Sequence, residues 1–223
     1  MLIDLHAHTY PISWDSNLTP DQLIELEKEA GVDGVCLTEH DYFWNEAECA
    51  ALAKKHSFLV LPAIEVNTEC GHILVYGLTN YQFGMHRIDQ LASMVEADRG
   101  VMIAAHPYRR YMPWYHLEGE ELSRALERAM TNPAYRRCVA LETLHGRGAP
   151  SQNDFSEKLR EMLDIPATGG SDAHQPDQVG RCVTRFERNV ASLVDLIEEL
   201  RAGRFEPVDR RPRGERSAPA PRV

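Results

Sequence analysis

The sequence contains no long apolar run. It nowhere has the roughly 18 consecutive apolar residues that a membrane-spanning helix needs. The first residues, Met1 to His6, do not combine a basic segment with an apolar one, as a signal peptide does. The five cysteines are an odd number, lie far apart and include no Cys-x-x-Cys pair, which argues against a disulfide framework and against a zinc ribbon. We therefore expect a cytoplasmic protein with buried thiols and no membrane partner.

The chain also has few positively charged residues relative to negatively charged ones. The chain has 24 lysines and arginines against 34 aspartates and glutamates, which gives a formal net charge of −10. This charge repels a phosphate backbone, so the composition argues against binding to duplex nucleic acid. With 223 residues, of which 43% are apolar, the chain is long enough for one globular domain with a sizeable core. The composition leaves the oligomeric state open.

Short apolar or β-branched runs alternate with helical patterns, which is typical of βα units around a parallel sheet. The first unit is the clearest: a strand over 2–6, a helix capped by Thr19 that ends at Gly31, and a strand over 34–38. Further strands are predicted over 58–66, 72–77, 101–105, 138–143, 165–169 and 182–186. Further helices are predicted over 45–55, 87–98, 120–130, 154–163 and 190–201. The pattern predicts a single-domain α/β protein, a closed or distorted β/α barrel over residues 1–206.

The last residues, 207–223, are rich in proline and arginine and have almost no large apolar side chain. Such a segment buries too little surface to offset the entropy lost on ordering. We therefore predict a disordered tail that begins at residue 207.

Histidine, aspartate and glutamate recur directly after the predicted strands. His6 and His8 are two residues apart, so in an extended chain both side chains point the same way and can reach one ion. Asp172 and His174 repeat this spacing after a later strand. In a β/α barrel the carboxyl ends of the strands meet at one face, so these separated residues are expected to converge. The other candidates at strand ends are His40, Glu65, His72 and His106.

A set of histidines and carboxylates without cysteine suits Zn²⁺, Mn²⁺ or Fe²⁺. One tetrahedral ion does not need so many ligands, so two or three divalent ions are predicted. Glu65 is the natural bridge, because its carboxylate has two oxygens. Two ions about 3.5 to 4 Å apart clamp the attacking hydroxide and the leaving oxygen of a displacement reaction. The pattern therefore favours hydrolysis of a phosphate ester by a metal-activated hydroxide.

Four motifs of the sequence resemble those of the polymerase and histidinol phosphatase (PHP) superfamily of metal-dependent phosphoesterases. The resemblance extends over residues 2–186. The motifs are Asp4-Leu5-His6-Ala7-His8-Thr9, Thr38-Glu39-His40-Asp41, Ala104-Ala105-His106-Pro107 and Gly170-Ser171-Asp172-Ala173-His174. The resemblance implies a small stand-alone member with a distorted seven-stranded β/α barrel and a trinuclear metal centre.

The resemblance also implies how the ligands are shared among three ions. The first ion takes His6, His8, Glu65 and Asp172, the second takes Glu65, His72 and His106, and the third takes His40, His174 and Asp15. Asp15 departs from the family pattern, because it lies in Ser13-Trp14-Asp15-Ser16 rather than in a Ser-Asp-Gly turn.

Arginine is a natural partner of phosphate, because its planar fork donates two hydrogen bonds. Arg109 lies shortly after His106 and Arg147 shortly after His145, so both are predicted to contact a small phosphorylated substrate near the strand ends. His145 itself is a candidate general acid for the leaving group, or a hydrogen-bonding wall of the site.

The prediction is therefore a metal-dependent phosphoesterase that acts on a small phosphomonoester or a nucleotide. Three alternatives stay open at this point. They are a phosphodiesterase or exonuclease of the same superfamily, an amidohydrolase-type metal hydrolase, and a non-catalytic metal-binding module.

Overall fold

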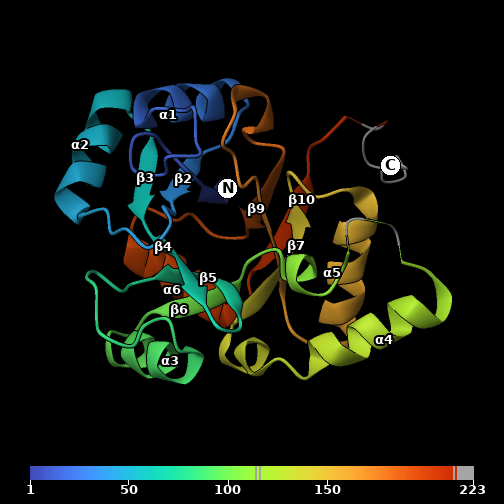
Figure 1. Ribbon diagram of the computed structural model, residues 1–223. Helices are drawn as coiled ribbons and strands as arrows, with labels where there is room; N and C mark the ends of the chain where they lie inside the picture. Colours follow the sequence, from blue (N-terminus) through green and yellow to red (C-terminus); the bar gives the residue numbers. More distant parts are fainter. Residues whose placement is uncertain (114, 116, 213, 215–223) are drawn as a thin grey trace.

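The computed structural model describes residues 1–113, 115, 117–212 and 214, which form a mixed α/β domain with ten strands and six α-helices (Figure 1). One sheet has the strand order β10-β9-β1-β2-β3 and the other the order β4-β5-β6-β7-β8. The strands are β1 (Leu2–Ala7), β2 (Gly34–Leu37), β3 (Leu59–Pro62), β4 (Ile64–Thr68), β5 (Gly71–Tyr76), β6 (Val101–Ala104), β7 (Ala140–His145), β8 (Ala167–Gly170), β9 (Cys182–Phe186) and β10 (Phe205–Asp209). The helices are α1 (Pro20–Glu29), α2 (Glu46–His56), α3 (Ile88–Ala97), α4 (Gly119–Met130), α5 (Pro150–Leu163) and α6 (Leu193–Ala202), with 3-10 helices η1 (Pro107–Arg110), η2 (Pro133–Arg137) and η3 (Pro176–Gln178).

The first sheet contains the βαβ units that the sequence predicts. Its strands β1, β2 and β3 run parallel and are connected by α1 and α2. Thr19 caps α1 and forms a reciprocal capping box with Gln22. A Ser or Thr followed three residues later by Glu or Gln is the sequence signature of this helix start. Buried side chains of both helices, Leu23 and Cys49 among them, pack against Val35 on β2.

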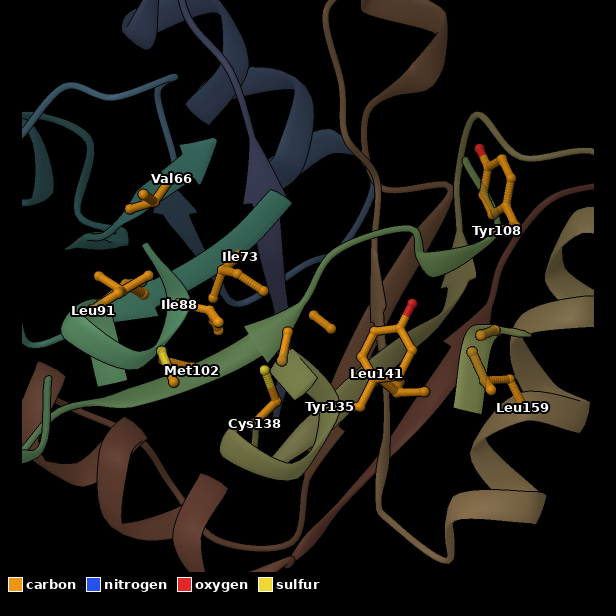
Figure 2. Packing of buried hydrophobic residues seen from close by; sticks show 14 of the residues in the cluster. Val66, Ile73, Ile88, Leu91, Met102, Tyr108, Tyr135, Cys138, Leu141 and Leu159 are labelled. Atoms are coloured by element: carbon orange, nitrogen blue, oxygen red, sulfur yellow. The ribbon is translucent and has the colours of Figure 1, made fainter. Parts of the chain in front are cut away.

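The second sheet is mixed. The pairs β4–β5 and β5–β6 are antiparallel, whereas β6, β7 and β8 run parallel. A hydrophobic cluster on one face joins Ile73 of β5 to Leu91 of α3 and Leu159 of α5 (Figure 2). Neighbouring residues of β5 point the other way, since Leu74 and Tyr76 belong to a second cluster that also contains Ile3 and Leu5 of β1.

The strands do not close into the predicted seven-stranded barrel. The described strands form two separate sheets, which two isolated bridges connect, Ala7 with Ala173 and His40 with Glu65. The strand predicted over 58–66 is in fact two strands, one in each sheet, because the chain leaves the first sheet after Pro62 and enters the second at Ile64. Apolar composition alone carries no signal for this change of sheet.

The boundary predicted at residue 206 is also wrong. Strand β10 continues to Asp209 and pairs antiparallel with β9, with Pro207 opposite Thr184. Proline is tolerated because β10 is the edge strand of its sheet. Arg211 is buried, pairs with Asp209 at 2.7 Å and donates a hydrogen bond to the Gly148 carbonyl oxygen at 2.8 Å. The rest of the predicted tail, residues 213 and 215–223, lies outside the described residues.

The five cysteines are all free; four are buried and Cys70 is partly exposed. Within the described part of the chain, no helix combines the length and the apolar character that crossing a bilayer requires.

Candidate metal centre

The strand ends bring the predicted ligand side chains together at the junction of the two sheets. β1 supplies His6 and leads into His8, β4 supplies Glu65, and β6 leads into His106. The two isolated bridges lie at this junction and bring the segments after β8 and β2 against β1 and β4. Asp172 follows β8, and its backbone N–H donates to the carbonyl oxygen of His6 at 2.7 Å. Short backbone links of this kind hold the side chains of two sheets in one place.

The first predicted ligand set forms a compact, buried group. The Nε2 atoms of His6 and His8 are 3.1 Å apart. Oδ1 of Asp172 lies 3.4 Å from Nε2 of His6 and 3.1 Å from Nε2 of His8. Glu65 places Oε1 3.5 Å from Nε2 of His6 and Oε2 3.3 Å from Nε2 of His8. All four side chains are at most 1% exposed, so bulk water does not contact this group.

Glu65 also contacts the second ligand set, as a bridging carboxylate must. Its Oε1 atom lies 2.8 Å from Nδ1 of His72 and 2.9 Å from Nε2 of His106. Its Oε2 atom lies 2.8 Å from Nδ1 of His40. Glu65 therefore lies between the first group and three further histidines.

The third predicted set lies on the more open side. Oδ2 of Asp15 is 3.1 Å from Nε2 of His174 and 3.6 Å from Nε2 of His40. The ring of His8 stacks on that of His40 at a centroid distance of 4.3 Å and tilts over that of His174 at 4.5 Å. About a third of the Asp15 side chain is exposed. The structure thus brings all nine predicted ligands together, Asp15 included, and their role as ligands stays a prediction.

The donor geometry fits divalent cations. Ligands about 2.0 to 2.1 Å from a tetrahedral ion lie about 3.3 Å from one another, and the 3.1–3.5 Å separations within the first group match this value. Buried polar atoms are normally hydrogen-bonded. Oε2 of Glu65 and Nε2 of His174 are buried and make no well-aligned hydrogen bond within the described part of the chain, although Nδ1 of His40 lies 2.8 Å from the first and Oδ2 of Asp15 lies 3.1 Å from the second. A cation between these pairs would bind both of their lone pairs.

Burial and charge oppose each other in the pKa values of the ligands. Burial by itself raises the pKa of Glu65, but the charge of His6 and the hydrogen bond from His106 hold that pKa well below its usual value. Burial dominates at His106 and His174 and lowers the pKa of each imidazole to about 4. These shifts favour the neutral imidazole, which is the state in which histidine binds a metal. At His8, burial by itself lowers the pKa, but the hydrogen bonds to Asp172 and Glu65 outweigh it and raise the pKa to about 9.

Two buried glutamates outside the predicted set hold the ligands in place. Oε1 of Glu142 lies 2.9 Å from Nδ1 of His6, and Oε2 accepts a hydrogen bond from the backbone N–H of His106 at 2.8 Å. Glu39 accepts a hydrogen bond from the hydroxyl of Ser13 at 2.5 Å, and that hydroxyl lies 3.2 Å from Nδ1 of His8. Such partners fix the ring orientation of a ligating histidine and raise its basicity.

The sequence contains a signal for both glutamates. Glu142 interrupts the apolar strand 140–145, and Glu39 directly precedes His40 in a motif already singled out. A carboxylate within a buried strand needs a partner.

The predicted catalytic residues converge on Asp172. While its Oδ1 atom faces the first group, its Oδ2 atom accepts hydrogen bonds from Arg109 at 2.6 Å and from Arg147 at 3.2 Å. His145 is fully buried, with Nε2 2.9 Å from the same oxygen and Nδ1 3.1 Å from the hydroxyl of Tyr108. The side chains of the two arginines are 37% and 35% exposed. They therefore reach from the buried carboxylate toward solvent.

Local backbone geometry is unusual at two of these strand ends. His106 has φ 27° and Asp172 has φ 50°, in the left-handed region that non-glycine residues rarely adopt. At Gly170, a Cβ atom would lie 2.6 Å from Cβ of His6 and would also collide with Oε1 of Glu142. The close approach of β8 to these side chains therefore requires glycine.

A cavity of about 230 Å³ opens beside the second ligand set. His72, His106 and Arg109 form part of its wall. A molecule in this cavity lies next to Glu65 and its histidines, as the substrate of a metal site must.

Two family models match the sequence. The model described as PHP domain matches residues 4–166, which is more than half of the chain, and the model described as PHP-associated matches residues 150–205. No curated protein matches the chain significantly.

Solved structures share the fold at low sequence identity. PsfC from Pseudomonas syringae is 18% identical, with a TM-score of 0.64 over 93% of this chain and 91% of that chain. A two-domain protein from Bacteroides vulgatus, described as containing a predicted PHP-like metal-dependent phosphoesterase, is 18% identical, with a TM-score of 0.64 over 94% of this chain and 64% of that chain. An amidohydrolase from Chromobacterium violaceum, solved with bound sulfate, is 16% identical, with a TM-score of 0.62 over 93% of this chain and 97% of that chain. At these identities the similarity is one of fold.

Proposed function

Because the chain belongs to the PHP domain family, whose members are metal-dependent hydrolases, we propose that it hydrolyses a small phosphomonoester. One observation carries the proposal: two partly exposed arginines stand beside a buried group of metal-type ligands, on the outer oxygen of the shared Asp172. A phosphate ester has the two features that this arrangement fits, namely anionic oxygens for guanidinium groups and a phosphorus centre for metal-assisted attack.

The ligand side chains have separate tasks in this proposal. His6, His8, Glu65 and Asp172 would hold one divalent ion, Glu65 with His72 and His106 a second, and Asp15, His40 and His174 a third. When bound, such ions activate water and stabilise the charge that develops on a phosphoryl group. The number of ions and the choice among Zn²⁺, Mn²⁺ and Fe²⁺ belong to the same proposal.

Arg109 and Arg147 bind and orient the phosphate. Each guanidinium donates one hydrogen bond to Asp172. Since a guanidinium has five N–H donors, further donors remain for phosphate oxygens. His145 fixes the same oxygen of Asp172, since one of its ring nitrogens contacts Oδ2 of Asp172 and the other contacts the hydroxyl of Tyr108. We therefore assign His145 a positioning role, and its action as a general acid stays a prediction.

The cavity favours a small substrate over a polymer. Sites for drug-sized ligands have volumes of about 300–1,000 Å³, whereas this one has about 230 Å³. That volume supports a phosphomonoester with a small leaving group over an oligonucleotide or a large nucleotide.

The test is hydrolysis by the Mn²⁺-loaded protein of a chromogenic aryl phosphomonoester, of the matching diester and of an aryl amide. The Asp172→Ala variant is the blank, and its circular dichroism and urea unfolding show whether it is folded. The proposal is supported if the parent protein releases phosphate from the monoester and the Asp172→Ala variant does not. Cleavage of the diester only indicates a phosphodiesterase, and cleavage of the amide only an amidohydrolase. Metal binding without cleavage of any compound refutes catalysis and leaves a metal-binding module.

A further inference from the structure

The cavity beside the second ligand set has a wall of uniform charge. The cavity is bounded by the end of β4, the start of β5, the end of β6 and the helices η1 and η2. Its lining contains Arg109 and Arg110 and no aspartate or glutamate among the described residues. The whole chain, by contrast, has ten more acidic than basic side chains. A positive wall in an acidic protein is a local property of this cavity.

The two arginines of this wall are engaged differently. Arg109 is committed to the metal centre, because it donates to Oδ2 of Asp172 at 2.6 Å. The side chain of Arg110 makes no ion pair and no hydrogen bond to any residue that the structure describes. Other polar groups of the lining have partners, for example the Thr68 hydroxyl, which donates to the Gly71 carbonyl oxygen at 2.6 Å. Arg110 is exposed and also lines a neighbouring pocket that contains Glu121, so its N–H donors are available to a ligand or to water.

The consecutive arginines offer two guanidinium groups to a ligand in the cavity. In the proposed function, Arg109 binds the phosphate group that reacts. Arg110 lies one residue further along η1, on the wall of the cavity that would receive the leaving group. Its planar fork is matched by a carboxylate, which accepts two parallel hydrogen bonds. The volume of about 230 Å³ leaves room for a small acid.

We propose that the leaving group of the substrate carries a carboxylate and that Arg110 binds it, so the substrate is a small phosphorylated carboxylic acid. This inference rests on the proposed function. It makes Arg110 a specificity-determining residue, which selects among phosphomonoesters and takes no part in the attack on phosphorus.

The test uses two esters that differ in one group. 3-Phosphoglycerate and glycerol 3-phosphate have the same carbon skeleton, with a carboxylate in the first where the second has a hydroxymethyl group. Binding of each ester to the metal-free protein is measured by isothermal titration calorimetry, so that no turnover intervenes. Hydrolysis of each by the Mn²⁺-loaded protein is then followed by phosphate release. The variants are Arg110→Gln and, as a matched control, Arg136→Gln, which removes an arginine that does not line this cavity.

The parent protein is expected to bind 3-phosphoglycerate at least about tenfold more tightly than glycerol 3-phosphate, the factor typical of one charge-assisted hydrogen bond. Arg110→Gln brings the two affinities within about twofold of each other, whereas Arg136→Gln keeps the preference. Equal binding of both esters by the parent protein overturns the inference, as does a preference that survives Arg110→Gln. Failure of the proposed function looks different, since the Mn²⁺-loaded protein then hydrolyses neither ester nor the aryl phosphate.

Discussion

Glu142 gives the sharpest test of how the metal centre is built. Its carboxylate is 1% exposed and joins two strand ends, with one oxygen 2.9 Å from Nδ1 of His6 and the other accepting the backbone N–H of His106 at 2.8 Å. Glu142→Gln keeps the size of the side chain but replaces one acceptor oxygen by an NH₂ donor. Either one of the two contacts is then lost, or His6 takes the tautomer with its proton on Nε2, which leaves no lone pair on Nε2 for a metal. The negative charge beside His6 is lost in both cases.

The expected effect is a weaker metal site in a folded protein. Loss of such a partner of a ligating histidine typically lowers metal affinity by about 10- to 100-fold, which corresponds to about 1.4 to 2.8 kcal/mol. The affinity is measured by titrating the metal-free protein with Zn²⁺ against a competing chelator. Circular dichroism and urea unfolding show that the variant is folded.

The matched control is Glu206→Gln. Glu206 lies on the edge strand β10, is 61% exposed and pairs with Arg185 at the surface. We expect the control to bind Zn²⁺ like the parent protein. If Glu142→Gln binds Zn²⁺ within twofold of the parent protein and is folded, the argument that Glu142 supports His6 is wrong.

Three further predictions concern the surrounding fold. Gly170→Ala places a methyl group against His6 and should lower the free energy of unfolding by about 1 to 3 kcal/mol, measured by urea unfolding, and should weaken Zn²⁺ binding in the same titration. Arg211→Met removes a partly buried ion pair and the buried donor to the Gly148 carbonyl oxygen. It should lower the free energy of unfolding by about 3 kcal/mol, measured by urea unfolding. An unchanged midpoint would contradict a structural role for this segment. Hydrogen bonds to Asp21 raise the pKa of His56 in the folded protein. Protonated His56 therefore adds to the free energy of unfolding in full at a pH below its pKa in the unfolded chain. This stabilisation is lost as the pH rises through its pKa in the folded protein. His56→Gln should therefore lower the thermal midpoint more at pH 6 than at pH 9, and an equal loss at both values would contradict this assignment.

The metal centre shows what local sequence determines. The spacing of His6 and His8 puts both rings on one side of an extended segment, and the structure places their Nε2 atoms 3.1 Å apart. The positions of α1 and α2 follow from their caps, Thr19 and Asn45, because a capping side chain acts on the first turn of its own helix. These features depend on residues a few positions apart, so the sequence is sufficient to predict them.

The supporting contacts could not be read in the same way. Glu142 and His6 are 136 residues apart, and Arg211 and Gly148 are 63 apart. Which distant residues meet depends on the path of the chain between the two sheets, and neither composition nor periodicity encodes that path. The assignment of 207–209 to a tail has the same origin, because β10 is stabilised by its pairing with β9 and not by its own apolar residues.

The sequence by itself determined the kinds of ligand, their position at strand ends and the alternation of strands and helices, because these depend on the chemistry and spacing of neighbouring residues. Tertiary structure alone decided that the strands form two sheets and that Asp172 has one oxygen toward the ligands and one toward the arginines. It also decided that Arg110 lies on a cavity without acidic residues. Each of these features is a contact between segments far apart in the chain, and its energy exists only once the whole domain has folded.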